Sequence, residues 1–229
     1  MKILISKKLP EPILHIIEEY GEILFLENDN FMPSPISHHP DSLCFYDNGK
    51  LIIPKNYTYG YDLFNKHNIV FEMTNESEGQ EYPHDTLVNG FVCNNILFCG
   101  KYISNNVLKY AKNNNYTIVF VKQAYAHCST IVLDNALITQ DTSIYNSAIK
   151  HNIDSLLIPQ GNISLPGYNE GFIGGSCMII KNNVIFYGDI SKHPSYNIIS
   201  SFLQNKGISI KYVKNLPLTD FGGGIVIGE

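Results

Sequence analysis

Side chains that can act as nucleophiles, bases or substrate-binding acids are concentrated in five short stretches of this sequence. The chain has eight His and five Cys, and four of the His and two of the Cys fall within these stretches. Such a grouping is typical of thiol-based catalysis, in which a cysteine attacks and a histidine moves the proton. The stretches are His38–Ser42, Tyr82–Thr86, His127–Thr130, Glu170–Cys177 and Asp220–Gly224.

Cys128 is the first candidate nucleophile, and it lies between His127 and Ser129. Neighbouring residues of a strand point to opposite faces, so His127 is a poor partner for Cys128. The base would then be His84 or His39, contributed by another stretch. For the chain as a whole the candidate bases are His127, His84 and His39, and the alternative for Cys128 is a structural role as a small buried residue.

Cys177 is the second candidate nucleophile, with the same structural alternative. It follows Gly174-Gly175-Ser176, and glycines allow the backbone to approach a ligand closely. Carboxylates in the same stretches can bind a cationic substrate or can cap a turn. These candidate substrate-binding acids are Asp41, Asp85, Glu170 and Asp220.

The run His38-His39-Pro40-Asp41 has the residue types of a metal site. Adjacent histidines in an extended chain rarely bind one ion together, so we predict no metal there. In an extended segment His39 and Asp41 share a face, which suits a histidine oriented by a carboxylate. The glycine runs at 174–175 and 222–224 lack the patterns of nucleotide-binding loops. We therefore expect no cofactor.

The elements that position these residues follow from a repeat. Four hydrophobic runs are each interrupted by a two-residue turn and then resume, at spacings of 46, 40 and 48 residues. Each spacing is close to one fifth of the chain, and the turn residues tolerate the positive φ that tight hairpins require. A helical pattern and a further strand follow, so the unit is strand, turn, strand, helix, strand. The turns are Asn48-Gly49, Asn94-Asn95, Asp134-Asn135 and Asn182-Asn183.

The two ends of the chain supply a fifth unit. The strand at 224–229 has no helix after it, and the strand at 2–5 has no hairpin partner before it. Pairing them closes a ring, which would remove free sheet edges. We predict one domain over residues 1–229, a five-fold pseudosymmetric α/β propeller of ββαβ units. The alternative is an ordinary α/β sheet with coincidental spacing.

A ring of five ββαβ units closed by its own termini resembles the pentein superfamily, which contains deiminases, amidinotransferases and dimethylarginine hydrolases. Asp41 in His38-His39-Pro40-Asp41, with Phe172-Ile173-Gly174-Gly175, is similar to a bacterial branch of that superfamily to which no activity is assigned. The resemblance implies a thiol-dependent hydrolase or transferase acting on a guanidine or amidine C–N bond. The resemblance implies that the catalytic histidine of these enzymes corresponds to His127 in this sequence.

This sequence also departs from the pattern of the superfamily. The resemblance places the nucleophilic cysteine near Gly223 or Gly224, where this chain has no Cys. Rotating the pattern by one unit pairs Cys177 with His84 and makes Asp41 the guanidinium-binding acid. The alternative function is a non-catalytic binding module that lacks the usual nucleophile.

Composition excludes several classes of protein. The net charge is -5 and all 16 basic residues are Lys. The chain therefore has no arginine that could bind a phosphate or carboxylate through two parallel hydrogen bonds. Nucleic-acid binding is therefore not expected. No apolar run approaches the roughly 18 residues that cross a bilayer. With no secretory signal recognised, we expect a cytoplasmic protein with reduced cysteines and a small-molecule ligand, its oligomeric state open.

Overall fold

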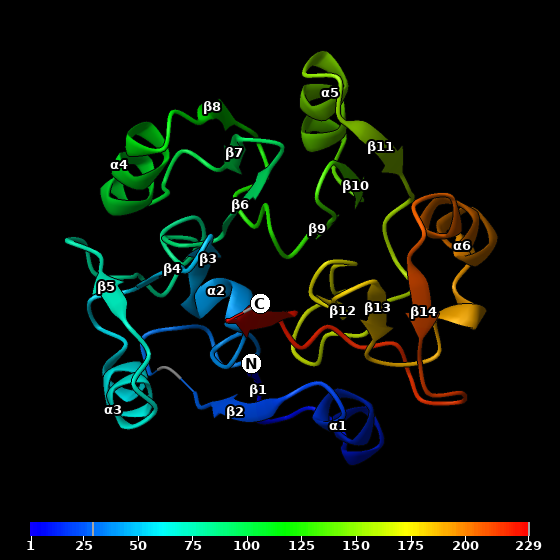
Figure 1. Ribbon diagram of the computed structural model, residues 1–229, viewed down its shortest axis with the longest axis horizontal. Coiled ribbons are helices and arrows are strands. Elements are labelled where there is room, and N and C mark those ends of the chain that lie inside the picture. Colours follow the sequence, from blue (N-terminus) through cyan, green and yellow to red (C-terminus); the bar gives the residue numbers. More distant parts are fainter. Residues whose placement is uncertain (29, 229) are drawn as a thin grey trace.

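The computed structural model describes residues 1–28 and 30–228. These residues form five three-stranded sheets, each with one helix, arranged around a centre (Figure 1). The first sheet contains β15 (Gly224–Ile227), β1 (Lys2–Ser6) and β2 (Glu22–Leu26), with α1 (Glu11–Glu18). The second and third contain β3 (Phe45–Asp47), β4 (Lys50–Ile53), α3 (Thr58–Lys66) and β5 (Phe71–Met73), then β6 (Gly90–Cys93), β7 (Ile96–Cys99), α4 (Asn105–Asn113) and β8 (Thr117–Phe120). The fourth and fifth contain β9 (Thr130–Val132), β10 (Ala136–Thr139), α5 (Thr142–Lys150) and β11 (Asp154–Leu157), then β12 (Cys177–Ile180), β13 (Asn183–Phe186), α6 (Tyr196–Asn205) and β14 (Ser209–Lys211).

Every sheet has the same topology. The first two strands are antiparallel, and the third returns parallel to the second after the helix. This confirms the predicted ββαβ unit. β15 pairs with β1 so that Ile225 lies opposite Leu4, which confirms the predicted pairing of the N- and C-terminal strands. Glu229, the last residue of the predicted strand, lies outside the described residues.

The prediction that ring closure removes every free edge is wrong. The five sheets stay separate, and each has two strands with a neighbour on one side only, an inner one (β15, β3, β6, β9 or β12) and an outer one (β2, β5, β8, β11 or β14). The reason is topological, because the chain passes from an outer strand inward through a loop and does not pair adjacent units edge to edge.

The residues of the turns explain the hairpins within the units. Asn48 and Gly49 have φ of 44° and 78°, and Asn94 and Asn95 have φ of 51° and 61°, as the first two hairpin turns require. The fourth turn lies one residue earlier than predicted, between β12 and β13, with positive φ at Lys181. The hairpin geometry therefore follows from short-range preferences.

The helices share one burial pattern. Each packs a pair of buried residues four positions apart against its sheet, the spacing of one helical face. The pairs are Ile13 and Ile17, Gly60 and Phe64, Val107 and Ala111, Ile144 and Ala148, and Ile199 and Leu203. The helices consequently form the outer layer, and the middle strands are buried between them and the centre (Figure 1).

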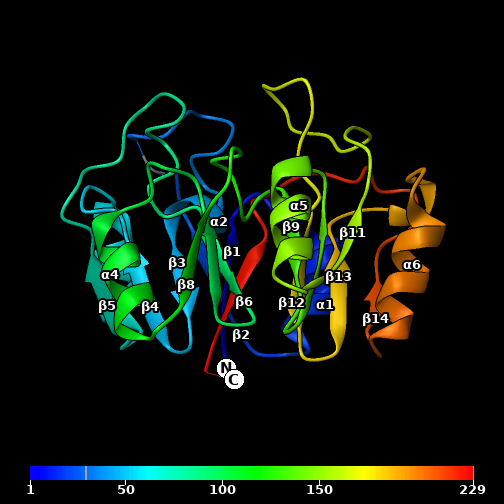
Figure 2. The ribbon, with the colours of Figure 1, turned by 90° about the horizontal axis from the view of Figure 1, so that it is seen from above.

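A short helix that the sequence did not suggest lies near the centre, α2 (Pro40–Leu43). Figure 2 shows the two termini together at one end of the molecule and the long connecting loops at the other. Within the described residues, no helix is long and apolar enough to cross a membrane.

Candidate active site

Two cavities meet at the centre of the ring. The first, here called the loop cavity, has a volume of about 150 Å³ and is lined by residues from the connecting loops. The second, the strand cavity, has a volume of about 170 Å³ and is lined largely by β9, β12 and β15. His39, Cys128 and Asp220 line the loop cavity, whereas Asp41 lines the strand cavity. The two cavities are therefore lined by different members of this group of four residues.

The helix α2 positions His39, Asp41 and Ser42. His39 precedes Pro40, which begins the helix, and the Asp41 amide donates to the Gly222 carbonyl oxygen (3.0 Å). The segment is thus helical, and the prediction of an extended run is wrong because Pro40 starts a turn there. His39 and Asp41 are nevertheless both buried, and one ligand atom of each lies within 4.8 Å of the other and of the Cys128 sulfur.

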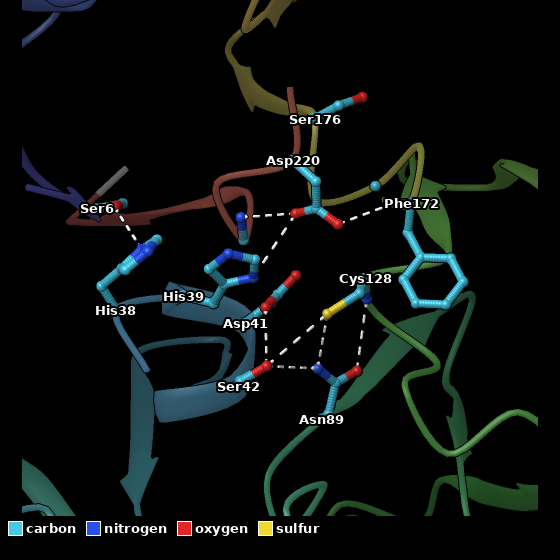
Figure 3. Close-up of polar contacts among 12 residues, drawn as sticks. Ser6, His38, His39, Asp41, Ser42, Asn89, Cys128, Phe172, Ser176 and Asp220 are labelled. Carbon is cyan, nitrogen blue, oxygen red and sulfur yellow. Dashed lines mark hydrogen bonds and ion pairs between the residues drawn. The ribbon is translucent and has the colours of Figure 1, made fainter. Parts of the chain in front are cut away.

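Cys128 is held by Asn89, a residue just before β6. The Asn89 Nδ2 donates to Cys128 Sγ (3.0 Å) and to Ser42 Oγ (3.3 Å), as Figure 3 shows. Its Oδ1 accepts from the amides of His127 (2.9 Å) and Cys128 (3.4 Å). One buried amide therefore fixes both the backbone and the sulfur of the candidate nucleophile.

Asp220 approaches the same point from the loop before β15. Its carboxylate accepts from the amides of Phe172 (2.8 Å) and Gly222 (2.9 Å), and Oδ1 lies 3.6 Å from His39 Nδ1 (Figure 3). A Cβ on Gly175 would overlap Oδ1 of Asp220, so the missing side chain at position 175 makes room for this carboxylate. Asp220 is thus placed to orient the His39 ring.

Burial dominates the electrostatics of this cluster. It raises the pKa of Asp41, and burial together with the neighbouring Asp41 raises the pKa of Asp220. Burial, then the charges of Asp41 and Asp220, raises the pKa of the Cys128 thiol well above its ordinary value. Burial lowers the pKa of His39 well below its ordinary value. Near neutral pH Cys128 is therefore a thiol and His39 an uncharged imidazole.

The remaining candidate residues lie elsewhere. His127 lines the strand cavity with its ring centroid 6.3 Å from that of Phe91, and burial lowers its pKa to about 4. It therefore faces a different cavity from Cys128. Cys177 also lines the strand cavity, and its Sγ lies 3.6 Å from the Ile173 carbonyl oxygen. His84 is exposed and packs against Tyr102, so the structure does not bring His84 to Cys177.

Two candidate acids do not join the cluster. Asp85 is buried and accepts a hydrogen bond from the hydroxyl of Tyr125, a residue that lines the loop cavity. Glu170 is exposed and lines the cavity itself. The aromatic rings of Tyr125 and Phe172 lie 6.2 Å apart on the same wall.

Sequence reasoning missed Asn89 and Ser42 as partners of Cys128. The second stretch was placed at residues 82–86, but β6 begins only at Gly90, so the residue nearest the strand was left out. A usable signal was present. Counting back six residues from the first three hairpin turns leads to Ser42, to Val88 beside Asn89, and to Cys128.

Three kinds of comparison relate the chain to known proteins. The model of one family, described as a family of unknown function (DUF6873), matches residues 4–225. No curated protein matches the chain. Solved structures do match across nearly its whole length.

One similar structure is the N-terminal domain of ArgZ, an arginine dihydrolase from cyanobacteria, bound to product; it is 11% identical, covers 97% of this chain and 94% of that one, and has a TM-score of 0.62. A second is dimethylarginine dimethylaminohydrolase from Pseudomonas aeruginosa in complex with citrulline, with 10% identity, 93% and 91% coverage and a TM-score of 0.58. A third is SxtG, an amidinotransferase from Microseira wollei in a saxitoxin biosynthetic pathway, with 10% identity, 95% and 78% coverage and a TM-score of 0.58. All three are penteins, and the pentein fold expected from the repeat is confirmed.

Proposed function

Since this chain belongs to the family of unknown function DUF6873 and has the pentein fold, we propose that it is a thiol-dependent hydrolase or transferase acting on a guanidine or amidine C–N bond. Cys128 is the proposed nucleophile. The observation that carries the proposal is the placement of its sulfur on the wall of the loop cavity, with atoms of His39 and Asp41 within 4.8 Å.

The loop cavity suits a planar cation. Tyr125, Tyr168 and Phe172 line it with aromatic rings, which attract cations over their faces. Glu170 and Asp220 add carboxylates to the same lining. A guanidinium or amidinium group bound there is attracted by these acids and lies beside the sulfur.

Binding of a cation also activates the thiol. The charges of Asp41 and Asp220 contribute to the raised pKa of Cys128, and a bound cation offsets them. The Asn89 Nδ2 then donates to the thiolate that forms. The thiol is therefore unreactive in the empty site and reactive in the loaded one.

The reaction balances with groups already present. The Cys128 proton passes to neutral His39 through one water, and the sulfur bonds to the central carbon of the substrate. The C–N bond breaks, and the leaving amine takes the proton from His39. Water or a second amine then attacks the S-bonded carbon and releases the thiol. Asp220 holds the His39 ring in place throughout.

A thiol-labelling experiment tests this proposal. The chain, freed of metals with a chelator, is treated with a haloacetamidine or the matching haloacetamide, and the modified cysteines are mapped by mass spectrometry. We expect Cys128 to react faster with the amidine and Cys177 to show no preference. A Cys177→Ser variant controls for the second buried thiol. Guanidines that protect Cys128 are then screened for release of an amine.

Slow labelling without any preference for the amidine would contradict the proposal. The alternative, a non-catalytic binding module, would then be favoured, and it is supported by Gly223 and Gly224 at the position where the resemblance places the nucleophile. A cytoplasmic location, where reducing conditions keep Cys128 as a thiol, is part of the proposed function.

A further inference from the structure

Three side chains at the centre of the ring converge on a single point. A ring nitrogen of His39, a carboxylate oxygen of Asp41 and the Cys128 sulfur all lie within 4.8 Å of one another. An atom at their centre would be at most about 2.8 Å from each, and ligand distances of about 2.0–2.3 Å for zinc require only a small inward rotation of the side chains.

The same point contains polar atoms that lack partners. Within residues 1–28 and 30–228, Nε2 of His39 and Oδ2 of Asp41 are buried without a hydrogen bond, and Nδ1 of His39 has only the Asp220 carboxylate at 3.6 Å. His39 is 0% exposed and Asp41 is 2% exposed. A buried polar group that stays unsatisfied carries a free-energy cost. A ligand that accepts electron pairs from both residues removes this cost.

We propose that His39, Asp41 and Cys128 form a three-ligand site for a soft divalent cation of the Zn²⁺ class. Imidazole, carboxylate and thiolate are all zinc ligands, and the thiolate selects against Mg²⁺ and Ca²⁺. Thiolate and carboxylate together carry two negative charges, which the ion neutralises. The fourth position faces the loop cavity, which His39 and Cys128 both line.

Neighbouring residues support each of the three ligands. Ser42 Oγ donates to the Oδ1 of Asp41 (3.2 Å), which leaves Oδ2 for the ion. Asn89 donates to the Cys128 sulfur (3.0 Å), and Asp220 Oδ1 lies 3.6 Å from His39 Nδ1. Partners of this kind orient the ligands of a metal and raise its affinity.

This site does not depend on the proposed function, although it uses the same sulfur. A bound ion occupies the electron pair of Cys128 that would attack a substrate, so a metal-loaded chain is expected to be blocked for thiol chemistry. The metal site and the enzyme activity can therefore fail separately. Labelling without metal tests the activity, and spectroscopy without substrate tests the metal site.

The test is a titration of the full-length, metal-free chain with Co²⁺, followed by displacement with Zn²⁺. We expect one equivalent of Co²⁺ to produce a thiolate-to-cobalt charge-transfer band, and one equivalent of Zn²⁺ to abolish it. The Cys128→Ser variant should lose the band. The matched Cys177→Ser variant, which alters a buried thiol of the strand cavity, should keep it. Asp220→Asn should weaken binding about 10- to 100-fold.

A second measurement covers the case in which Cys128→Ser does not fold. The wild-type chain is labelled with a small maleimide with and without one equivalent of Zn²⁺, and protection of each cysteine is mapped. Selective protection of Cys128 supports the site. Absence of a stoichiometric charge-transfer band in the wild type, or equal protection of Cys128 and Cys177, overturns it.

Discussion

Replacing Asn89 with alanine removes the side chain that holds the candidate nucleophile. Its Oδ1 accepts from the His127 amide (2.9 Å) and more weakly from the Cys128 amide (3.4 Å), and both donors lose their partner. A buried donor left unsatisfied costs about 1–3 kcal/mol, so we expect a total loss of about 3 kcal/mol. For a chain of this size that corresponds to a decrease in Tm of roughly 6–12 °C.

The same substitution alters the chemistry of the thiol. The Asn89 Nδ2 donates to Cys128 Sγ (3.0 Å), and a hydrogen bond to a charged group contributes about 1.5–3 kcal/mol. Without it the thiolate is less stable, and the pKa of Cys128 rises further. Labelling of Cys128 at fixed pH should then slow by about 10- to 100-fold, since 1.36 kcal/mol is a factor of about ten.

Asn106→Ala is the matched control for Asn89→Ala. Asn106 is also buried, and it bonds Glu72 (2.7 Å), Met73 (3.2 Å) and Asn75 (2.9 Å) far from the site. Its loss should lower Tm to a similar degree and leave Cys128 labelling unchanged. Calorimetry and mass-spectrometric labelling at one pH measure both effects. The reasoning is refuted if Asn89→Ala has the wild-type Tm, or if both variants label Cys128 equally slowly.

Two further predictions concern Asp220. Gly175→Ala should displace the Asp220 carboxylate and lower the free energy of unfolding in urea by about 2–4 kcal/mol, because the amides of Phe172 and Gly222 then lose their acceptor. The control is Gly207→Ala, where φ is 72° and no atom lies within 4 Å of the new Cβ; it should lower the free energy of unfolding by only about 1 kcal/mol. Equal losses in the two variants would contradict this account. The pKa of Asp220 is raised by burial and then by Asp41, so its contribution to stability is full below pH about 4 and is lost as pH rises through the raised value. The free energy of unfolding of Asp220→Asn relative to wild type should therefore increase between pH 4 and pH 8, and a difference independent of pH would count against the raised pKa.

The architecture was predictable because its signals are local. The Asn48-Gly49 and Asn94-Asn95 turns adopt the positive φ expected of their residue types, and the hydrophobic runs beside them become the hairpins. Ser104 accepts a hydrogen bond from the Asn106 amide and so caps the start of α4 through a contact only two residues apart. Closure of the ring followed from counting, because one strand at each end lacked a partner.

The centre was less predictable because its contacts are not local. α2 has four residues, too few to show a helical period, so the relative placement of His39 and Asp41 was assigned from the wrong backbone. The choice between Cys128 and Cys177 depends on which of two cavities each sulfur faces. That outcome is decided by tertiary packing, as is the arrival of Asn89 from a neighbouring unit at the Cys128 sulfur.

The pairing of β1 with β15 has a consequence for synthesis of the chain. Residues 2–5 find their antiparallel partners only in residues 224–227, more than two hundred residues later. At about 5–20 residues per second, a ribosome needs roughly 10–40 s to make the intervening segment. During that time the inner edge of β1 lacks its partner strand, while the four internal units can each complete their own hairpin as they emerge. Among the five units, the one that contains β1 is therefore the first to begin and the last to be completed, and its inner edge stays unpaired while the other four are made.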